Sequence, residues 1–384
     1  MGMSAEQRRR RILEVVQERG TVRVSELADE LGVAAVTARR DVAQLAAQDL
    51  LAHGYGSASW PEHTPPYLPV RVDRARSAIT LAGGRSSAPT LGMLVPSAAY
   101  YYAEVVRGAQ AACAAIGARL VLGISGYRSH EDDVQIGRLL DAGAAGLLLT
   151  PTWDRNAVDG QIDRFEELKV PCVLVERRPA PTAFATGLDR VCSDHAYGAL
   201  LAIRLLAELG HRRIALAAHD SPAGSGVRSG YLCALDVLGL GVPPIDVIDT
   251  YSLETNPVGF ETAAERLLAA VRDHGVTAAL IHNDVDAIML VRRLATVGVR
   301  VPDDLSVIAY DDEVAAFADI PLSAVQPPKR AVGRIAVEML LGRLRDSRVA
   351  GSDDGDWSPR RHVDLLPRLT IRESCRAPGG GEID

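Results

Sequence analysis

The chain has 384 residues, of which 47% are hydrophobic and 24% charged, the balance of a globular protein with room for two or three domains. No apolar run approaches the roughly 20 residues of a membrane-spanning helix, and no apolar signal-peptide core follows the arginines at 8–11. We therefore expect a cytoplasmic protein. The net charge of −7 argues against a general polyanion binder.

The five cysteines are scattered along the chain, and none of them forms a Cys-x-x-Cys pair. Neither a structural zinc site nor a disulfide framework is therefore predicted. Cys192-x-x-His195 is the nearest approach to a ligand pair, and it has no second pair. Since no nucleophile with a base stands out either, we expect no metal, no cofactor and no enzymatic activity.

The first 58 residues have the pattern of a small helical domain that ends in a hairpin. After an amphipathic first helix, residues 24–33 predict a short helix and a tight turn, and residues 34–48 predict the helix that follows. Residues 50–56 then predict a small β-wing. A helix, a tight turn, a second helix and a wing are typical of a domain that reads DNA.

The helix expected at 34–48 has two distinct faces. Ala38, Val42 and Leu45 fall at i, i+4 and i+7, so we expect them to face the core of this domain. At about 100° per residue, the side chains that point away from the core are those of Val36, Thr37, Arg39 and Arg40.

This outward face has the chemistry of direct base recognition. Arg39 and Arg40 are suited to O6 and N7 of guanine in the major groove. Val36 and the methyl group of Thr37 are suited to a thymine methyl. The alternative is that the two arginines are a solvated helix face, with Asp41 paired to one of them. Within a helix-turn-helix pattern we favour DNA contact.

Contact with DNA phosphates is less clear from the composition. Residues 1–60 carry eight arginines and eight acidic residues, so affinity has to come from local clusters. Ser25, at the start of a helix, can present backbone N–H groups to a phosphate. The arginines at 8–11 fit a solvated helix face and a phosphate clamp equally well.

From residue 90 the pattern changes, after a linker at 59–88 that is rich in proline and glycine. Short apolar strands now alternate with amphipathic helices, as in residues 91–95 and 103–116. Such an alternation predicts parallel sheets covered by helices. We therefore expect a mainly helical domain at 1–58, an α/β domain at 89–375 and a disordered tail at 376–384.

Residues 7–58 resemble the DeoR-type winged helix-turn-helix. The resemblance rests on the arginine-rich first helix, on Val-x-Val-Ser-Glu-Leu-Ala at 22–28, and on Gly-Val-x-x-x-Thr-x-Arg-Arg-Asp at 32–41. Two positions depart from the family pattern. Ala34 replaces the usual serine, and the wing keeps only His53 of its basic side chains. The resemblance implies that this domain binds operator DNA, with His53 in the wing.

Residues 90–373 resemble the sensor of the lactose/galactose repressor family, which shares its fold with periplasmic sugar-binding proteins. The matching runs include Leu-Gly-His-Arg-Arg-Ile-Ala at 209–215, Val-Pro-Asp-Asp-Leu-Ser-Val at 301–307, and Pro-Leu-Ser-Ala-Val-Gln-Pro at 321–327. The resemblance implies a homodimer and a sensor of two lobes. We expect one lobe at about 89–193 and 326–345, and the other at about 194–325 and 361–373.

In a two-lobed α/β protein the ligand lies at the carboxyl ends of the strands. Three consecutive tyrosines, Tyr100 to Tyr102, follow the first strand in a chain with only 4% aromatic residues. Since aromatic faces stack on sugars or bases, we expect Tyr101 or Tyr102 to contact an effector. The alternative is that they anchor the start of the helix.

The resemblance adds further effector contacts. Asn283 and Asp284 are implied to bind hydroxyls or ring nitrogens, although one of them can instead cap a helix. Asp311, at the end of another strand, is also an implied contact. We expect Arg228 to be one too, although it stands two residues before Gly230, whereas the arginine of the family stands three residues before that glycine. We expect Trp153 at the rim of the site.

Together these features predict a DNA-binding transcriptional regulator, a repressor, whose operator affinity is controlled by a small-molecule effector. The partners expected are operator DNA, a sugar or nucleoside-like effector and a second copy of the chain. The alternative is a small-molecule sensor with a head that does not bind DNA and acts through a protein partner.

Overall fold

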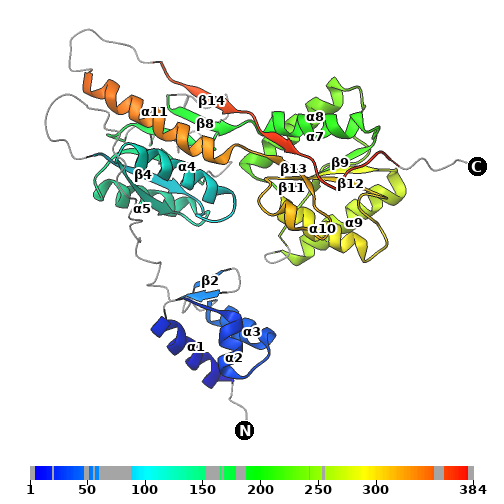
Figure 1. Ribbon diagram of the computed structural model, residues 1–384, viewed down its shortest axis with the longest axis horizontal. Helices are drawn as coiled ribbons and strands as arrows, with labels where there is room; N and C mark the ends of the chain where they lie inside the picture. The colour runs from blue at the N-terminus through cyan, green and yellow to red at the C-terminus, as the bar shows by residue number, and fades with distance from the viewer. Residues whose placement is uncertain are drawn as a thin grey trace, which may run out of the picture. The chain divides into compact units, whose positions relative to one another are not determined.

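The computed structural model describes residues 5–19, 21–46, 52–54, 57–59, 88–152, 165, 168–178, 187–241, 243–252, 256–349 and 359–378 (Figure 1). The chain forms two compact units, Met1–Arg76 and Ser77–Asp384. We call the first the head and the second the sensor. Among the described residues, no helix is long and apolar enough to cross a membrane.

The head is a winged helix-turn-helix. Its elements in chain order are α1 (Ala5–Arg19), β1 (Thr21–Arg23), α2 (Val24–Leu31), α3 (Ala35–Ala46), β2 (Ala52–Gly54) and β3 (Ser57–Ser59). Strand β3 lies between β1 and β2 and is antiparallel to both, which makes the wing part of a three-stranded sheet. The predicted helices, turn and wing are therefore confirmed.

The core of the head contains one face of each helix. Ala38 and Val42 of α3 are fully buried and Leu45 is 3% exposed, which confirms the predicted inward face. Between α2 and α3, Gly32 has a φ of 63°, the left-handed conformation that glycine adopts without strain. This glycine closes the tight turn and sets α3 at an angle to α2.

The sensor has two six-stranded sheets, one in each lobe. The first has the order β14-β8-β7-β6-β4-β5, and all of its pairs are parallel. Its strands are β4 (Thr90–Val95), β5 (Arg119–Ile124), β6 (Ala144–Leu149), β7 (Cys172–Val175), β8 (Asp189–Ser193) and β14 (His362–Leu365).

The second sheet has the order β10-β9-β11-β12-β13-β15, and only its edge strand β15 is antiparallel. Its strands are β9 (Ile214–Ala218), β10 (Ile248–Asp249), β11 (Ala278–His282), β12 (Ser306–Tyr310), β13 (Ser323–Gln326) and β15 (Arg368–Thr370). Both sheets confirm the α/β architecture expected from the alternation of strands and helices.

Helices cover both faces of each sheet. In the first lobe, α4 (Tyr101–Ala115) and α11 (Lys329–Val349) pack on one face and α5 (Ser129–Asp141) on the other. In the second lobe, α7 (His195–Glu208) and α8 (Pro222–Val237) cover one face, and α9 (Pro257–His274) and α10 (Asp284–Ala295) cover the other. A short 3-10 helix, η1 (Ala315–Phe317), follows β12.

Helices α4 and α11 lie side by side and approach each other very closely (Figure 1). A Cβ atom at Gly108 of α4 would lie 2.0 Å from the carbonyl oxygen of Arg330. A Cβ atom at Gly333 of α11 would lie 1.9 Å from the carbonyl oxygen of Val105. Both positions therefore need glycine, because any larger residue would push the two helices apart.

Within the described residues, the chain passes between the lobes three times, after β8, after β13 and after β14. The third crossing corrects the lobe boundaries expected from the sequence, which placed all of 361–373 in the second lobe. Strand β14 pairs with β8 of the first lobe, with Asp194 N donating to Leu365 O at 2.8 Å. Strand β15 and the residues after it belong to the second lobe, where Arg372 N donates to Ser323 Oγ at 2.9 Å and Arg376 N donates to Ser306 Oγ at 3.1 Å. Strand pairing rather than chain order decides which sheet a segment joins. Arg376 therefore does not belong to the disordered tail expected at 376–384.

Candidate functional site

Several buried polar atoms of the sensor have no hydrogen-bond partner among the residues that the structure describes. In the first lobe they are Ser125 Oγ, Thr150 Oγ1 and Thr152 Oγ1, and in the second lobe His219 Nδ1, His282 Nδ1 and Asp311 Oδ1. Buried polar groups are nearly always hydrogen-bonded in folded proteins. A set of unmatched groups therefore indicates a place where a ligand can supply the partners.

These residues share a position in the fold. Ser125 follows β5 and Thr150 follows β6, while His219 follows β9 and Asp311 follows β12. The carboxyl ends of parallel strands lie along one edge of a sheet, which is where α/β proteins bind ligands. Each lobe therefore has one polar edge.

Side-chain contacts bring the two polar edges together. The Tyr100 hydroxyl, from the loop after β4, donates a hydrogen bond to Asp284 Oδ1 at the start of α10. His195, at the first crossing, lies with Nε2 3.7 Å from Glu176 Oε2 of the first lobe. Its Nδ1 lies 3.3 Å from the Tyr310 hydroxyl of the second lobe. We call this region, where both strand edges meet, the inter-lobe site.

The tyrosine run has a different role at each position. The Tyr101 hydroxyl donates to Glu176 Oε1 at 2.8 Å and lies 3.1 Å from Ser193 Oγ. The buried Tyr102 hydroxyl accepts from Arg177 Nη1 at 3.0 Å. Both predicted contacts therefore use their hydroxyls within the first lobe, and the tyrosine that reaches the second lobe is Tyr100.

Glu176 accepts several hydrogen bonds in the first lobe and was not among the site residues expected from the sequence. It accepts hydrogen bonds from the backbone N–H of Ser193 at 3.0 Å and from Ser193 Oγ at 2.7 Å. Although burial acts to raise the pKa of Glu176, hydrogen bonds from His195 and Ser193 outweigh it and hold the pKa below the ordinary value. The signal that could have identified Glu176 is its place directly after the apolar strand β7.

Asn283 and Asp284 both have structural partners. Asn283 caps α10, with its Oδ1 accepting from the backbone N–H of Asp286 at 3.1 Å. Asp284 Oδ2 accepts three backbone N–H groups at 313–315, at 2.6, 2.7 and 3.1 Å. The Asp284 carboxylate therefore fixes the loop after β12 and leaves Oδ1 to accept from Tyr100.

Asp311 has a raised carboxyl pKa at the second-lobe edge of the inter-lobe site. It is 4% exposed, and burial together with the charge of Asp284 raises its pKa to about 7, against the opposing effect of Lys329 and His195. Its φ of 89° is a left-handed backbone conformation that non-glycine residues rarely adopt. A buried carboxyl that is neutral at one pH and charged at another can donate or accept a ligand hydrogen bond.

His282 adds a neutral imidazole to the second lobe. Burial, with the nearby charges of His195, His219 and Arg228, lowers its pKa to about 3. Its ring packs edge-on against Tyr310, with 5.4 Å between the ring centroids. A neutral ring with an unmatched nitrogen is suited to a hydrogen bond with an uncharged polar ligand.

Arg228 and Trp153 are the two remaining residues that were expected at the effector site. Arg228 Nη2 donates to the carbonyl oxygen of Ala218 at 2.7 Å and to Asp249 Oδ1 at 2.6 Å. These contacts hold the guanidinium group at the carboxyl end of β9. Trp153 lies outside the described residues. Among the residues that are described, no group of histidine, cysteine and acidic side chains could hold a metal ion.

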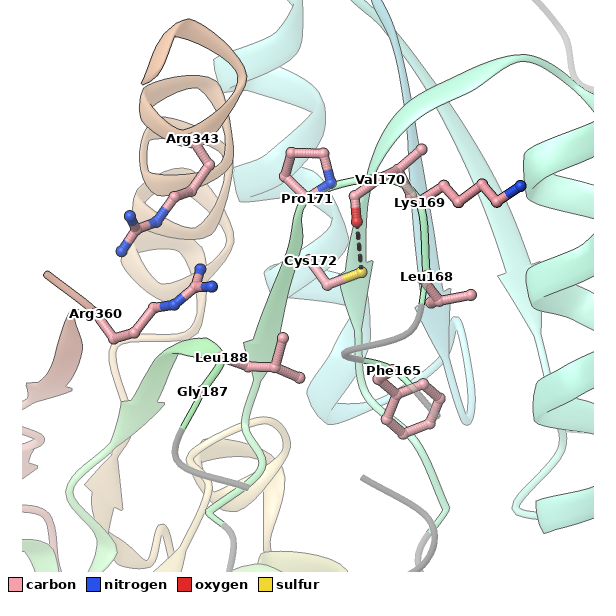
Figure 2. A pocket seen from close by; sticks show the side chains of 10 residues that line it. All are labelled: Phe165, Leu168, Lys169, Val170, Pro171, Cys172, Gly187, Leu188, Arg343 and Arg360. Carbon is pink, nitrogen blue, oxygen red and sulfur yellow. Dashed lines mark hydrogen bonds between the residues drawn. The ribbon is translucent and has the colours of Figure 1, made fainter. Parts of the chain in front are cut away.

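A pocket of about 480 Å³ in the first lobe is separate from the inter-lobe site. Pro171 and Cys172, where β7 begins, line it (Figure 2), whereas Glu176 follows the other end of that strand. One of its arginines, Arg343, is tied to buried Asp189 at 2.6 and 2.8 Å. We therefore do not assign the effector to this pocket.

In the head, two side chains of the expected recognition face of α3 are described. Arg40 is exposed and Thr37 is half-buried, while the side chains of Ser25, Val36, Arg39 and His53 lie outside what the structure describes. The alternative placed Asp41 on the outward face, paired with Arg39 or Arg40, but the structure shows a different partner for Asp41. Asp41 is buried and instead accepts from Arg8 Nε at 2.9 Å, because its side chain faces α1.

A winged helix-turn-helix joined to a two-lobed α/β sensor with a polar inter-lobe site defines a ligand-sensing DNA-binding protein. Comparisons with known proteins agree with this class. A DeoR-like helix-turn-helix domain model matches residues 8–64, and a periplasmic binding protein-like domain model matches residues 203–375.

Among curated relatives, an HTH-type transcriptional repressor PurR from Vibrio atlanticus is 30% identical over 308 residues, which cover 78% of this chain and 86% of the relative. Among solved structures, a complex of the transcriptional regulator CelR with cellobiose is 25% identical, with a TM-score of 0.61 over 75% of this chain and 86% of that one. A sugar-binding LacI-family regulator from Escherichia coli is 26% identical, with a TM-score of 0.56 over 76% of this chain and 100% of that one.

The chain belongs to the PurR/LacI family of transcriptional regulators. It is a DNA-binding regulator that combines a DeoR-like head with the sensor of that family.

Proposed function

We propose that the chain is a repressor whose operator affinity is controlled by an uncharged polar effector, a sugar or a nucleoside-like molecule, in the inter-lobe site. The observation that carries this proposal is the set of unmatched buried polar atoms along the strand edges of both lobes. Bound between the edges, an effector would change the angle between the lobes. A coupling of about 1–3 kcal/mol would then change operator affinity about 5- to 150-fold.

The chemistry of the edges supports this class of effector. The unmatched atoms are hydroxyl oxygens in the first lobe, and imidazole nitrogens and one carboxyl oxygen in the second. Such groups match hydroxyls or ring nitrogens of a ligand rather than a phosphate. The related regulator CelR was solved as a complex with cellobiose, a sugar. We propose Asp311, Tyr101 and Arg228 as contacts, with Tyr102 and Asn283 holding the surrounding structure and Asp284 holding it through Oδ2.

In the head, we propose that α3 reads DNA bases. The observation that favours this role is that Arg40 is exposed and Asp41 is paired with Arg8, so Asp41 does not neutralise the outward face. Arg39, Val36 and Thr37 belong to the same proposed face, and Ser25 and His53 to the phosphate contacts beside it. We further propose that the chain forms a homodimer, which would place two heads on two half-sites.

The effector is tested by a thermal-shift screen against sugars and nucleosides, followed by calorimetry on the best compound. We expect Asp311→Ala to weaken binding about tenfold or more, the loss typical of a hydrogen bond to a charged group. The control is Asp319→Ala, which removes an exposed carboxylate of the second lobe. Equal affinity of wild type and Asp311→Ala would refute the assignment of Asp311.

The DNA contact is tested by gel shift on the region upstream of the chain's own gene. The double variant Arg39→Ala/Arg40→Ala is expected to lose specific binding while it keeps effector binding. Arg334→Ala, at an exposed arginine of α11, is the control. Unchanged affinity of the double variant would instead favour a head that acts through a protein partner.

A further inference from the structure

Tyr100 has a backbone conformation that a tyrosine rarely adopts. Its φ is 50° and its ψ is −125°, and it occupies the N-cap position of α4 without a side-chain capping hydrogen bond. Serine, threonine, aspartate or asparagine would serve better at such a position. A non-glycine residue persists in an unfavourable conformation where the surrounding structure holds it, and such residues gather at functional sites.

A hydrogen bond of the Tyr100 side chain keeps this residue in its conformation. Its hydroxyl donates to Asp284 Oδ1 in the opposite lobe. Burial raises the pKa of the Tyr100 phenol, and the carboxyls of Asp311, Asp284 and Glu313 raise it further. The phenol therefore stays protonated and acts as a hydrogen-bond donor among acceptors of the second lobe.

Asp284 is a rigid acceptor. Its other oxygen, Oδ2, accepts the backbone N–H groups of Glu313, Val314 and Ala315. These three hydrogen bonds fix the plane of the carboxylate and present Oδ1 to the first lobe. Two of these groups act on the pKa of Asp311: the charge of Asp284 raises it, and a hydrogen bond with Tyr100 lowers it. The Tyr100 phenol therefore lies among the carboxyls of the second lobe, and one of these is Asp311, whose Oδ1 is an unmatched buried atom.

We infer that Tyr100 is an intramolecular ligand of the second lobe, which holds the lobes together and occupies the Asp284 acceptor that an effector donor would otherwise use. The inference rests on the proposed function in one respect, that the inter-lobe site is the effector site. The consequence is that the site selects between effectors by their hydrogen-bond donors. A compound that only stacks or fills space leaves the phenol in place, whereas a compound with a hydroxyl or N–H donor at this position can displace it.

The bridge itself is tested without any effector, by electron-spin distance measurement in the full chain. One label is placed on native Cys233, which is exposed on α8 of the second lobe. The other is placed on Val134→Cys, at a 45% exposed position on α5 of the first lobe. Cys113, Cys172 and Cys192 are buried, and half-buried Cys375 is replaced by serine in every sample. Doubly labelled protein is diluted with an excess of unlabelled protein, so that distances between different chains do not contribute.

Tyr100→Phe keeps the ring and removes the hydroxyl. We expect the ratio of closed to open lobes to fall about ten- to hundredfold, the range for a hydrogen bond to a charged acceptor. The matched control is Tyr197→Phe, at a half-buried tyrosine of α7 that has no part in the bridge. A distance distribution for Tyr100→Phe that superimposes on that of wild type overturns the inference.

Competition with an effector is tested by calorimetry with ribose, with cellobiose and with the best compound of the thermal-shift screen. Displacement predicts that a compound with a donor at this position binds Tyr100→Phe more tightly than wild type. Equal or weaker binding overturns the competition. If no compound binds either protein, the proposed effector fails, but the distance measurement still decides whether Tyr100 bridges the lobes.

Discussion

Arg8 of α1 and Asp41 of α3 form an ion pair inside the head, with 2.9 Å between Nε and Oδ2. The two side chains are only 16% and 8% exposed, so the pair is largely removed from water. It joins the first helix to the proposed recognition helix, next to the apolar core that contains Val42. Arg8 therefore acts on DNA binding through the position of α3, whereas exposed Arg40 on the same helix is free to act directly.

We therefore predict different effects for Arg8→Met and Arg40→Ala. Arg8→Met leaves the Asp41 carboxylate buried without this partner and is expected to destabilise the head by about 1–3 kcal/mol. Arg40→Ala removes an exposed side chain and is expected to change stability by less than about 0.5 kcal/mol, but to weaken operator binding. Hydrogen exchange of the α3 amides in the full chain measures stability, and a salt-titrated gel shift measures binding. Equal protection of α3 in Arg8→Met and wild type would contradict a stabilising role for the pair.

The contact between α4 and α11 predicts a large effect of one methyl group. Gly333→Ala places a Cβ atom 1.9 Å from the carbonyl oxygen of Val105, so the helices have to separate. We expect the sensor to lose about 3 kcal/mol or more, measured by urea unfolding. The control is Gly137→Ala on α5, where a Cβ atom meets nothing within 4 Å. That variant is expected to gain about 0.4–1 kcal/mol. A Gly333→Ala sensor as stable as wild type would show that the helices can move apart at little cost.

Asp311 predicts a pH dependence of sensor stability. Its pKa is raised from 3.8 to about 7, mainly by burial, so the folded state favours the protonated form. The stability that this group contributes is fully present below pH 3.8 and is lost as the pH rises to about 7. Asp311→Asn cannot ionise and does not undergo this loss.

The stability difference between Asp311→Asn and wild type is therefore expected to be small near pH 4 and to grow to about 4 kcal/mol above pH 7, at about 1.4 kcal/mol per pKa unit. Urea unfolding at a series of pH values measures the difference. Asp319→Asn controls for the loss of an exposed carboxylate. A difference that does not change with pH would mean that Asp311 ionises alike in the folded and unfolded chains.

The periodicity of the sequence was sufficient for the architecture. The i, i+4, i+7 spacing of Ala38, Val42 and Leu45 identified the buried face of α3, since a helix repeats its faces whatever it packs against. The alternation of apolar strands with amphipathic helices identified both parallel sheets for the same reason. Strand ends follow from that pattern, which places Asp311 directly after a strand, but it was the resemblance to the repressor sensors that implied an effector contact there.

The tertiary structure decided which polar groups meet. Tyr100 and Asp284 are 184 residues apart, and Glu176 meets His195 only where the chain crosses between the lobes. Local periodicity does not predict such pairs, because they depend on how the sheets of the two lobes pack against each other. The same holds for β14, whose place beside β8 depends on strand pairing. The sequence by itself therefore determined the helices, strands and their buried faces, and only the packing of the two lobes decided that Tyr100, rather than Tyr101 or Tyr102, reaches across the inter-lobe site.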